Sequence, residues 1–78
     1  MSNSLHLHTS HMPSEDPEFG DVIAQYHENG WLVYVDENSK VNDWLEPIMK
    51  TAIEQDKIFI NFDSKQKVNN KFKTFTWK

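Results

Sequence analysis

The feature that most constrains the fold is a stripe of apolar residues at helical spacing near the middle of the chain. The stripe consists of Leu45, Ile48, Met49, Ala52 and Ile53. This period places the side chains on one face of an α-helix, and that face needs a second layer to cover it. Asp43 and Glu46 have the spacing of a capping box. We therefore expect an amphipathic helix from about Trp44 to Gln55.

Three segments have the patterns of strands. Trp31–Val35 is a short, apolar and β-rich run, typical of a strand that is buried on both faces. Lys57–Asp63 alternates, so that alternate residues of 58–62 are expected to face the core. Lys71–Trp77 follows a polar loop, and we expect it to return antiparallel to the strand before it. Because a strand–helix–strand unit crosses over with a right-handed turn, the first two strands are predicted to be parallel.

Residues 17–29 admit two interpretations. Asp16–Glu18 resembles a helix start, with aspartate at the N-cap and proline at the first helical position. The apolar residues that follow share one helical face, and they are Phe19, Val22, Ile23 and Tyr26. Asn29-Gly30 is also a strong hairpin-turn signal, which would pair Val22–His27 with Trp31–Asp36. We favour the helix, because its start signal and its period agree.

Together these elements predict an α+β fold in the order α-β-α-β-β, with a three-stranded mixed sheet and two helices packed on it. The hairpin interpretation gives the order ββαββ. All Phe, Tyr and Trp residues lie between Phe19 and Trp77, so we place a single domain at residues 17–78 and expect residues 1–16 to be a disordered N-terminal tail. Within the tail, Ser10-His11-Met12 matches the scar of a common cloning site, so residues 1–11 are either native or vector-derived.

Charge is distributed unevenly along the chain. The formal net charge is -4, yet residues 64–78 carry five lysines and no acid. The acidic remainder is complementary to a basic surface, and such complementarity steers association. We therefore expect a small acidic, non-enzymatic binding protein, of the inhibitor, antitoxin, immunity or phage-encoded host-modulator kind. Its expected partner is a protein that it occludes, such as a basic nucleic-acid-processing enzyme of a bacterium.

The candidate partner-binding residues are acids of loops and helix starts, together with two tryptophans as anchors. They are Glu28, Trp31, Asp36, Glu37, Asp43, Trp44 and Glu46. The alternative is a single-stranded nucleic-acid-binding module on a C-terminal hairpin, whose rings stack on bases while its lysines contact phosphate. Its residues would be Lys65, Lys67, Lys71, Lys73, Phe75 and Trp77. Lysines that protect the edge of a core strand are the simpler interpretation, so we do not expect nucleic acid as the partner.

Several classes of function are disfavoured by what the sequence lacks. Gly20 and Gly30 are the only glycines, which leaves no glycine-rich phosphate loop. The chain has no cysteine, and His27 is the only histidine of the predicted domain, so we expect no metal site, no cofactor and no enzymatic activity. The longest apolar run falls far short of the roughly 18 residues of a membrane span. We expect a cytoplasmic protein that is a monomer or a homodimer.

Overall fold

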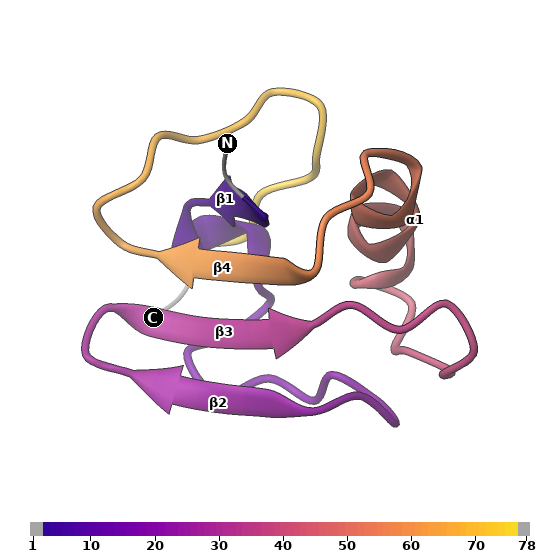
Figure 1. The fold of residues 1–78 in the computed structure, drawn as a ribbon. Helices are drawn as coiled ribbons and strands as arrows, with labels where there is room; N and C mark the ends of the chain where they lie inside the picture. Colours follow the sequence, from indigo (N-terminus) through magenta and orange to yellow (C-terminus); the bar gives the residue numbers. More distant parts are fainter. Residues whose placement is uncertain (1–2, 77–78) are drawn as a thin grey trace.

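The computed structural model describes residues 3–76, and its strands form one mixed sheet (Figure 1). In chain order the elements are β1 (Ser4–Leu7), the 3-10 helix η1 (Thr9–His11), β2 (Ala24–His27), β3 (Gly30–Tyr34), α1 (Glu46–Glu54) and β4 (Phe59–Asp63). The strand order is β1-β4-β3-β2, so β1 and β2 are the edges of the sheet. The α+β class is confirmed. The described residues, however, form a four-stranded sheet and one α-helix, where three strands and two helices were expected.

Helix α1 is the element that the apolar stripe predicts, although it is shorter than expected. The stripe residues that become buried are Leu45, Ile48, Met49 and Ala52. The N-cap position is occupied by Leu45, and no side chain caps the helix. The Glu46 N–H instead donates to the carbonyl oxygen of Asn42 at 3.1 Å. The expected capping box of Asp43 and Glu46 is therefore wrong, because the turn before the helix supplies the acceptor.

Residues 24–34 form a hairpin, so the predicted helix over residues 17–29 is wrong. β2 and β3 are antiparallel, with Tyr26 opposite Trp31. Gly30 has a φ of 156°, and a Cβ atom at this position would lie 1.9 Å from the carbonyl oxygen of Phe62 in the neighbouring strand. Only glycine permits so close an approach of two backbones. The Asn29-Gly30 turn signal thus prevails over the helical period of the preceding residues.

Strand β4 pairs antiparallel with β3, and the expected parallel pairing of these strands is wrong. Helix α1 and its loops lie at the end of the sheet where β3 stops and β4 begins (Figure 1). The helix has nine residues, which at 1.5 Å per residue span only about 13.5 Å. The antiparallel pairing shows that the chain re-enters the sheet at the end from which it left. The alternation over residues 58–62 is confirmed for Ile60 and Phe62, which are buried, whereas Ile58 precedes the strand and is exposed.

The N-terminal segment belongs to the core, and the expected disordered tail is wrong for the described residues 3–16. β1 pairs parallel with β4 and directs Leu5 and Leu7 into the core. His11 and Met12, at the end of η1 and just after it, are 0% and 1% exposed. Alternate side chains of a strand share a face, so a short strand with two leucines covers the core without any aromatic residue.

The described part of the C-terminal segment, residues 64–76, forms turns and irregular backbone in place of the expected strand and hairpin. The edge of β4 that a C-terminal strand needs is occupied by β1. The segment crosses over η1 instead, where the Phe75 N–H donates to the carbonyl oxygen of Ser10 at 2.7 Å. Phe72 packs against the core, and its ring meets that of His11 edge-on at a centroid distance of 5.9 Å. Trp77 lies outside the described residues.

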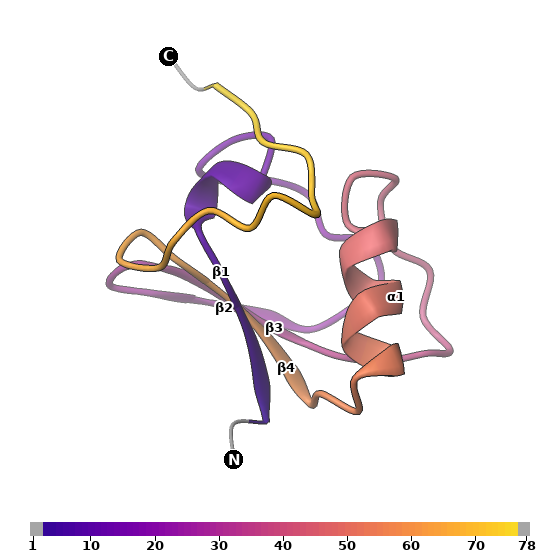
Figure 2. The ribbon, with the colours of Figure 1, turned by 90° about the horizontal axis from the view of Figure 1, so that it is seen from above.

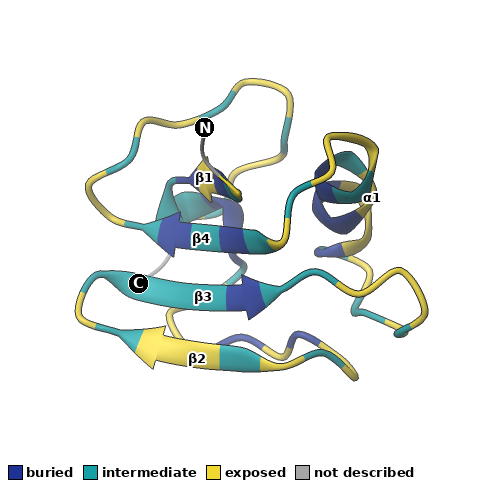
Figure 3. Ribbon diagram, viewed as in Figure 1, coloured by how far each residue is buried: buried dark blue, intermediate teal, exposed yellow. Residues whose placement is uncertain are grey.

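One face of the sheet is covered and the other is open. Figure 2 shows α1, η1 and the C-terminal segment on the same side of the sheet. The covered side holds the core, which consists of Leu5, Leu7, Met12, Phe19, Val33, Leu45, Ile48, Met49, Ala52, Ile60 and Phe62. Burial is concentrated in β4, β1 and α1, whereas the residues of β2 are half-buried or exposed (Figure 3). The edge strand β2 and the segment before it therefore form much of the accessible surface.

Candidate functional site

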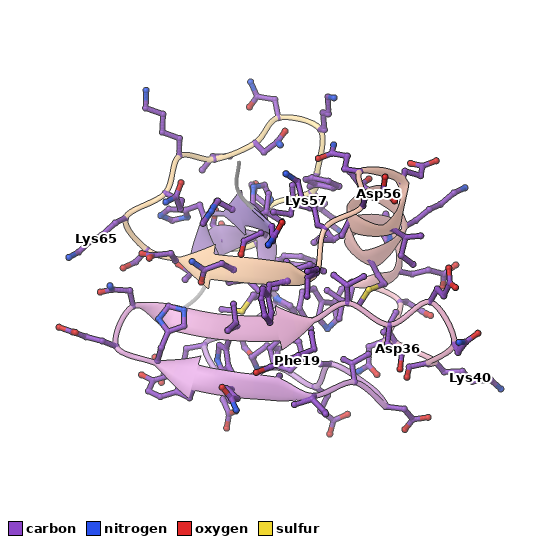
Figure 4. All side chains as sticks on the ribbon, viewed as in Figure 1. Phe19, Asp36, Lys40, Asp56, Lys57 and Lys65 are labelled. Atoms are coloured by element: carbon purple, nitrogen blue, oxygen red, sulfur yellow. The ribbon has the colours of Figure 1, made fainter. Side chains whose placement is uncertain are left out.

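The uneven charge of the sequence becomes a separation of charge in space. The lysine-rich residues 64–76 pass over the β1 side of the molecule (Figure 1), and Lys65 projects from this segment (Figure 4). The segment that leads from η1 to β2 carries acids to the opposite side, and the β2–β3 turn adds another. These exposed acids are Glu15, Asp16, Glu18, Asp21 and Glu28. The β2 side therefore carries more acids than lysines, with Lys40 beside Asp21, whose N–H donates to the Lys40 carbonyl oxygen at 2.8 Å.

A hollow of about 370 Å³ opens beside β2 and is lined by Glu15, Asp16, Tyr26 and Trp31. We call it the β2 pocket. Tyr26 and Trp31 face each other across the hairpin, and their rings meet edge to face at a centroid distance of 5.2 Å. Tyr26 is 71% exposed, so its ring rests on Trp31 and remains open to an incoming group. Aromatic faces attract cations and carboxylates pair with them, so this combination of residues suits a positively charged side chain.

Two indole groups hold the acidic segment against the body of the protein. Trp31 Nε1–H donates to the carbonyl oxygen of Glu15 at 2.9 Å, and Trp44 Nε1–H donates to the carbonyl oxygen of Glu18 at 2.8 Å. Phe19 is buried between the two indoles, with ring centroids 5.2 Å from Trp31 and 5.4 Å from Trp44. The acids of this segment are thus displayed from an anchored backbone, which lowers the entropy lost when they bind a partner.

A second hollow, of about 390 Å³, lies between the start of α1 and the C-terminal segment. We call it the α1 groove, and it is lined by Asp43, Trp44, Pro47, Ile48, Lys71, Phe72, Lys73 and Phe75. The Lys73 Nζ atom lies 5.2 Å from the centroid of the Phe75 ring. Phe72 is packed against the core. Both rings are therefore engaged within the protein, one by a lysine and one by the core.

The open face of the sheet carries a hydrogen-bonded polar row. His27 Nε2 lies 2.9 Å from Asn61 Oδ1, although the two residues are on strands separated by β3. Gly30 stands opposite His27 on β3 and has no side chain to block this contact. Beside the row, the rings of Tyr34 and Phe59 meet edge to face at 5.0 Å. The row satisfies polar side chains of β2 and β4 where no second layer covers the sheet.

The predicted partner-binding residues are distributed over several surfaces. Trp31 lies in the β2 pocket, and Glu28 lies in the adjoining β2–β3 turn. Asp43 and Trp44 line the α1 groove, and Glu46 is the first residue of α1. The two tryptophans donate their indole N–H groups to the acidic segment, so they position that segment and do not project as free anchors.

Asp36 and Glu37 are separated from this surface, because they follow β3 at the end opposite the β2–β3 turn. The Ser39 hydroxyl donates to the Asp36 carboxylate at 2.7 Å, and the Asn38 N–H donates to it at 2.9 Å. These two hydrogen bonds, that of Ser39 first, lower the pKa of the Asp36 carboxyl. Asp36 thus closes its own turn, which is a common role of aspartate in loops.

The residues predicted for the nucleic-acid alternative also lie on more than one surface. Lys65 and Lys67 are exposed in the loop after β4. Lys71, Lys73 and Phe75 line the α1 groove, where they meet Asp43 and Trp44 from the partner-binding set. Trp77 lies outside the described residues. The groove therefore mixes both signs of charge around an apolar floor, unlike the uniformly basic track that binds a nucleic-acid strand.

Sequence reasoning did not identify three residues of the β2 pocket. It placed Glu15 and Asp16 in a disordered tail, and it placed Tyr26 on the buried face of a helix. The Asn29-Gly30 turn signal identifies Tyr26, because a hairpin there brings Tyr26 opposite Trp31 on the facing strand. Glu15 and Asp16 have no such local signal, since the tertiary hydrogen bond from Trp31 Nε1–H to the carbonyl oxygen of Glu15 brings them to the pocket.

Within residues 3–76 no three His, Cys, Asp or Glu side chains are grouped so that they could hold a metal ion. In the same part of the chain no helix is both long enough and apolar enough to cross a membrane. Comparisons with protein families, with curated proteins and with solved structures found no match to this chain.

Proposed function

We propose that this is a non-enzymatic binding protein that occludes a basic surface of a partner protein, as inhibitors, antitoxins and immunity proteins do. The observation that carries the proposal is the β2 pocket, where Glu15 and Asp16 lie beside the rings of Tyr26 and Trp31. Carboxylates next to aromatic rings complement an arginine or lysine side chain, through charge-assisted hydrogen bonds and cation–π attraction. An exposed tyrosine adds contact area with little loss of conformational entropy, which is typical of binding surfaces.

The acids around the pocket support the same kind of partner. Glu18, Asp21 and Glu28 are exposed on the β2 side, and a concentration of one charge accelerates the approach of a surface of opposite charge. Most of the lysine-rich segment, residues 64–76, passes over the other side of the molecule (Figure 1), but it starts beside the β2–β3 turn, where the Ser64 N–H donates to the carbonyl oxygen of Asn29 at 2.9 Å. Binding through the β2 side is therefore expected to weaken as the salt concentration rises.

The nucleic-acid alternative has less support from the arrangement of the C-terminal segment. A stacking platform needs ring faces that are free for bases. Phe72 packs on the core, and Phe75 is covered by Lys73. We expect labelled single-stranded DNA or RNA to bind no tighter than about 100 µM at physiological salt, near the weak end for non-specific contacts. Micromolar binding with a steep dependence on salt would favour the alternative over our proposal.

The proposal is tested by affinity capture from a bacterial lysate with matched variants as bait. The pocket variant combines Glu15→Gln and Asp16→Asn, and a second pocket variant is Tyr26→Ala. The control combines Glu54→Gln and Asp56→Asn, which removes the same charge from the end of α1, away from the pocket. We expect a stoichiometric partner with a basic surface, retained by the wild type and the control and lost from both pocket variants. A partner that all baits retain equally, or the absence of any stoichiometric partner at low salt, would refute the proposal.

A further inference from the structure

We infer that strand β2 is a docking strand, to which the partner adds an extended segment that carries arginine or lysine. This inference rests on the proposed function and deepens it, because it names the part of the partner that is recognised. β2 ends the sheet, and no strand of the described residues lies beyond it. Addition of a strand at such an edge is a recurring mode of peptide recognition, in which backbone hydrogen bonds give affinity and side-chain pockets give specificity.

The alternation of hydrogen-bonded and non-bonded residue pairs in the hairpin shows which backbone groups of β2 are available to a further strand. The Tyr34 N–H donates to the carbonyl oxygen of Ile23 at 2.9 Å, and these residues are opposite each other in the register of the hairpin. In an antiparallel pair, bonded and non-bonded positions alternate. The N–H and C=O groups of Ala24 and Tyr26 therefore point away from β3, toward the free edge. Within residues 3–76 no hydrogen bond engages them.

The charge beside this edge selects the occupant. Glu15, Asp16 and Glu28 lie near the ends of β2 and at its side, while the exposed side chains of the strand itself, Gln25 and Tyr26, are uncharged. A second copy paired through the same edge would bring the same acids together, since a two-fold interface places each patch against itself. A segment with basic residues gains attraction from these acids where a second copy meets repulsion. The occupant is therefore a basic extended segment of a partner.

The β2 pocket supplies the specificity for such a segment. Tyr26 offers its outward backbone groups to the incoming strand, and its ring forms one wall of the pocket. A residue that pairs with Tyr26 across the new ladder has its Cα atom about 5.5 Å away. An arginine or lysine at that place, on the covered side of the sheet, extends into the pocket between the Tyr26 ring and the carboxylates of Glu15 and Asp16. Alternate residues of the segment then face the open side.

The test uses the full chain and a blocked, fluorescein-labelled peptide in which threonine and arginine alternate. Two control peptides are matched to it, one with glutamate in place of arginine and one with every second backbone amide N-methylated. Binding is followed by fluorescence anisotropy and by the amide signals of the 15N-labelled protein. We expect the arginine peptide to bind, with the largest shifts and slowed hydrogen exchange at Ala24 and Tyr26. Both control peptides are expected to bind about ten-fold more weakly or not at all.

Variants of the protein separate the edge from the pocket. Ala24→Pro removes an outward N–H at the first position of the strand, where proline is tolerated, so the fold is retained while binding is lost. Glu15→Gln with Asp16→Asn is expected to weaken binding about ten-fold, and the control Glu54→Gln with Asp56→Asn to leave it unchanged. If Ala24→Pro does not fold, the N-methylated peptide makes the same test from the other side of the interface.

Three outcomes would overturn the inference. The first is equal binding of the N-methylated and unmodified arginine peptides, which shows that backbone pairing is not used. The second is self-association of the protein without peptide that Ala24→Pro abolishes, which makes a second copy the occupant. The third is capture of a basic partner that the Glu15→Gln and Asp16→Asn variant loses but Ala24→Pro retains. In this third case the proposed function stands and only the docking strand fails.

Discussion

The ring of His11 joins the two ends of the described chain, because its Nδ1 atom lies 3.0 Å from the carbonyl oxygen of Lys73, 62 residues away. Its Nε2 atom lies 3.0 Å from the backbone nitrogen of Asn69. A carbonyl only accepts and a backbone N–H only donates, so Nδ1 carries the proton and Nε2 accepts. His11 is fully buried, and both ring nitrogens are satisfied by the C-terminal segment. The imidazole therefore holds this segment over the core.

Replacement of His11 by phenylalanine should destabilise the protein and release the C-terminal segment. The ring would still fill the space, but the partly buried carbonyl of Lys73 and N–H of Asn69 would lose their partner, at a total cost of about 1–3 kcal/mol. Urea unfolding measures the change. Lys73→Ala is the matched control, because the bond uses the backbone carbonyl and survives the loss of the side chain. An equal effect of the two substitutions would show that the His11 ring does not hold the C-terminal segment in place.

Leu7→Ala should cost about 2–5 kcal/mol, since it leaves a cavity under β1. Leu7 is fully buried on the strand that pairs with β4. Removal of residues 1–8 should unfold the protein at room temperature, because the total stability of a small domain is only about 5 kcal/mol. Thermal melts followed by circular dichroism measure both effects. His6→Ala, on the exposed side of the same strand, serves as the control and should change the melting temperature little. A truncated chain that melts like the full chain would show that β1 is dispensable.

Gly30→Ala should be among the most damaging single substitutions. The new Cβ atom would lie 1.9 Å from the carbonyl oxygen of Phe62, and the φ of 156° at this position is unfavourable for any other residue. Because the obstacle is backbone of the adjacent strand, the hairpin must shift away from β4, and we expect a loss of about 3 kcal/mol or more. Asn29→Ala, at the neighbouring position of the same turn, should cost much less. Comparable melting temperatures for the two variants would disprove this explanation.

Ser39→Ala should raise the pKa of Asp36 toward its usual range. The Ser39 hydroxyl is the main cause of the lowered pKa, and the Asn38 N–H is the second. Because the pKa is lower in the folded chain, these hydrogen bonds favour folding above the unfolded pKa of about 3.9. That contribution is lost as the pH falls through the folded pKa. NMR titration of the Asp36 carboxyl carbon measures the change. Ser14→Ala, a serine of another segment, is the control, and an unchanged Asp36 titration in Ser39→Ala would reject the assignment.

Around the β2 pocket, the sequence contains the correct turn signal, but a helical period in the preceding residues favours a different structure. Asn29-Gly30 indicates the hairpin, but the apolar residues from Phe19 to Tyr26 also have a helical period. The structure separates these roles, because Phe19 packs between two indoles whereas Tyr26 is exposed on β2. An apolar period shows which residues would share one face of a helix. It does not show whether a residue is packed against distant rings, as Phe19 is, or left exposed, as Tyr26 is. The carboxylates of Glu15 and Asp16 join the pocket only through the contact with Trp31.

The sequence by itself determined the α+β class, the helix at α1 and the burial of Ile60 and Phe62, because a repeating pattern of side chains within one segment specifies which face is apolar. Only the tertiary structure decided the neighbours of β4. β1 has two apolar side chains that point to the core, which is too weak a local pattern to indicate a strand, and its partner is distant in the chain. Once β1 occupies that edge, the C-terminal segment cannot pair with β4. Competition for one set of backbone hydrogen bonds is a property of the whole chain, and no single segment encodes its outcome.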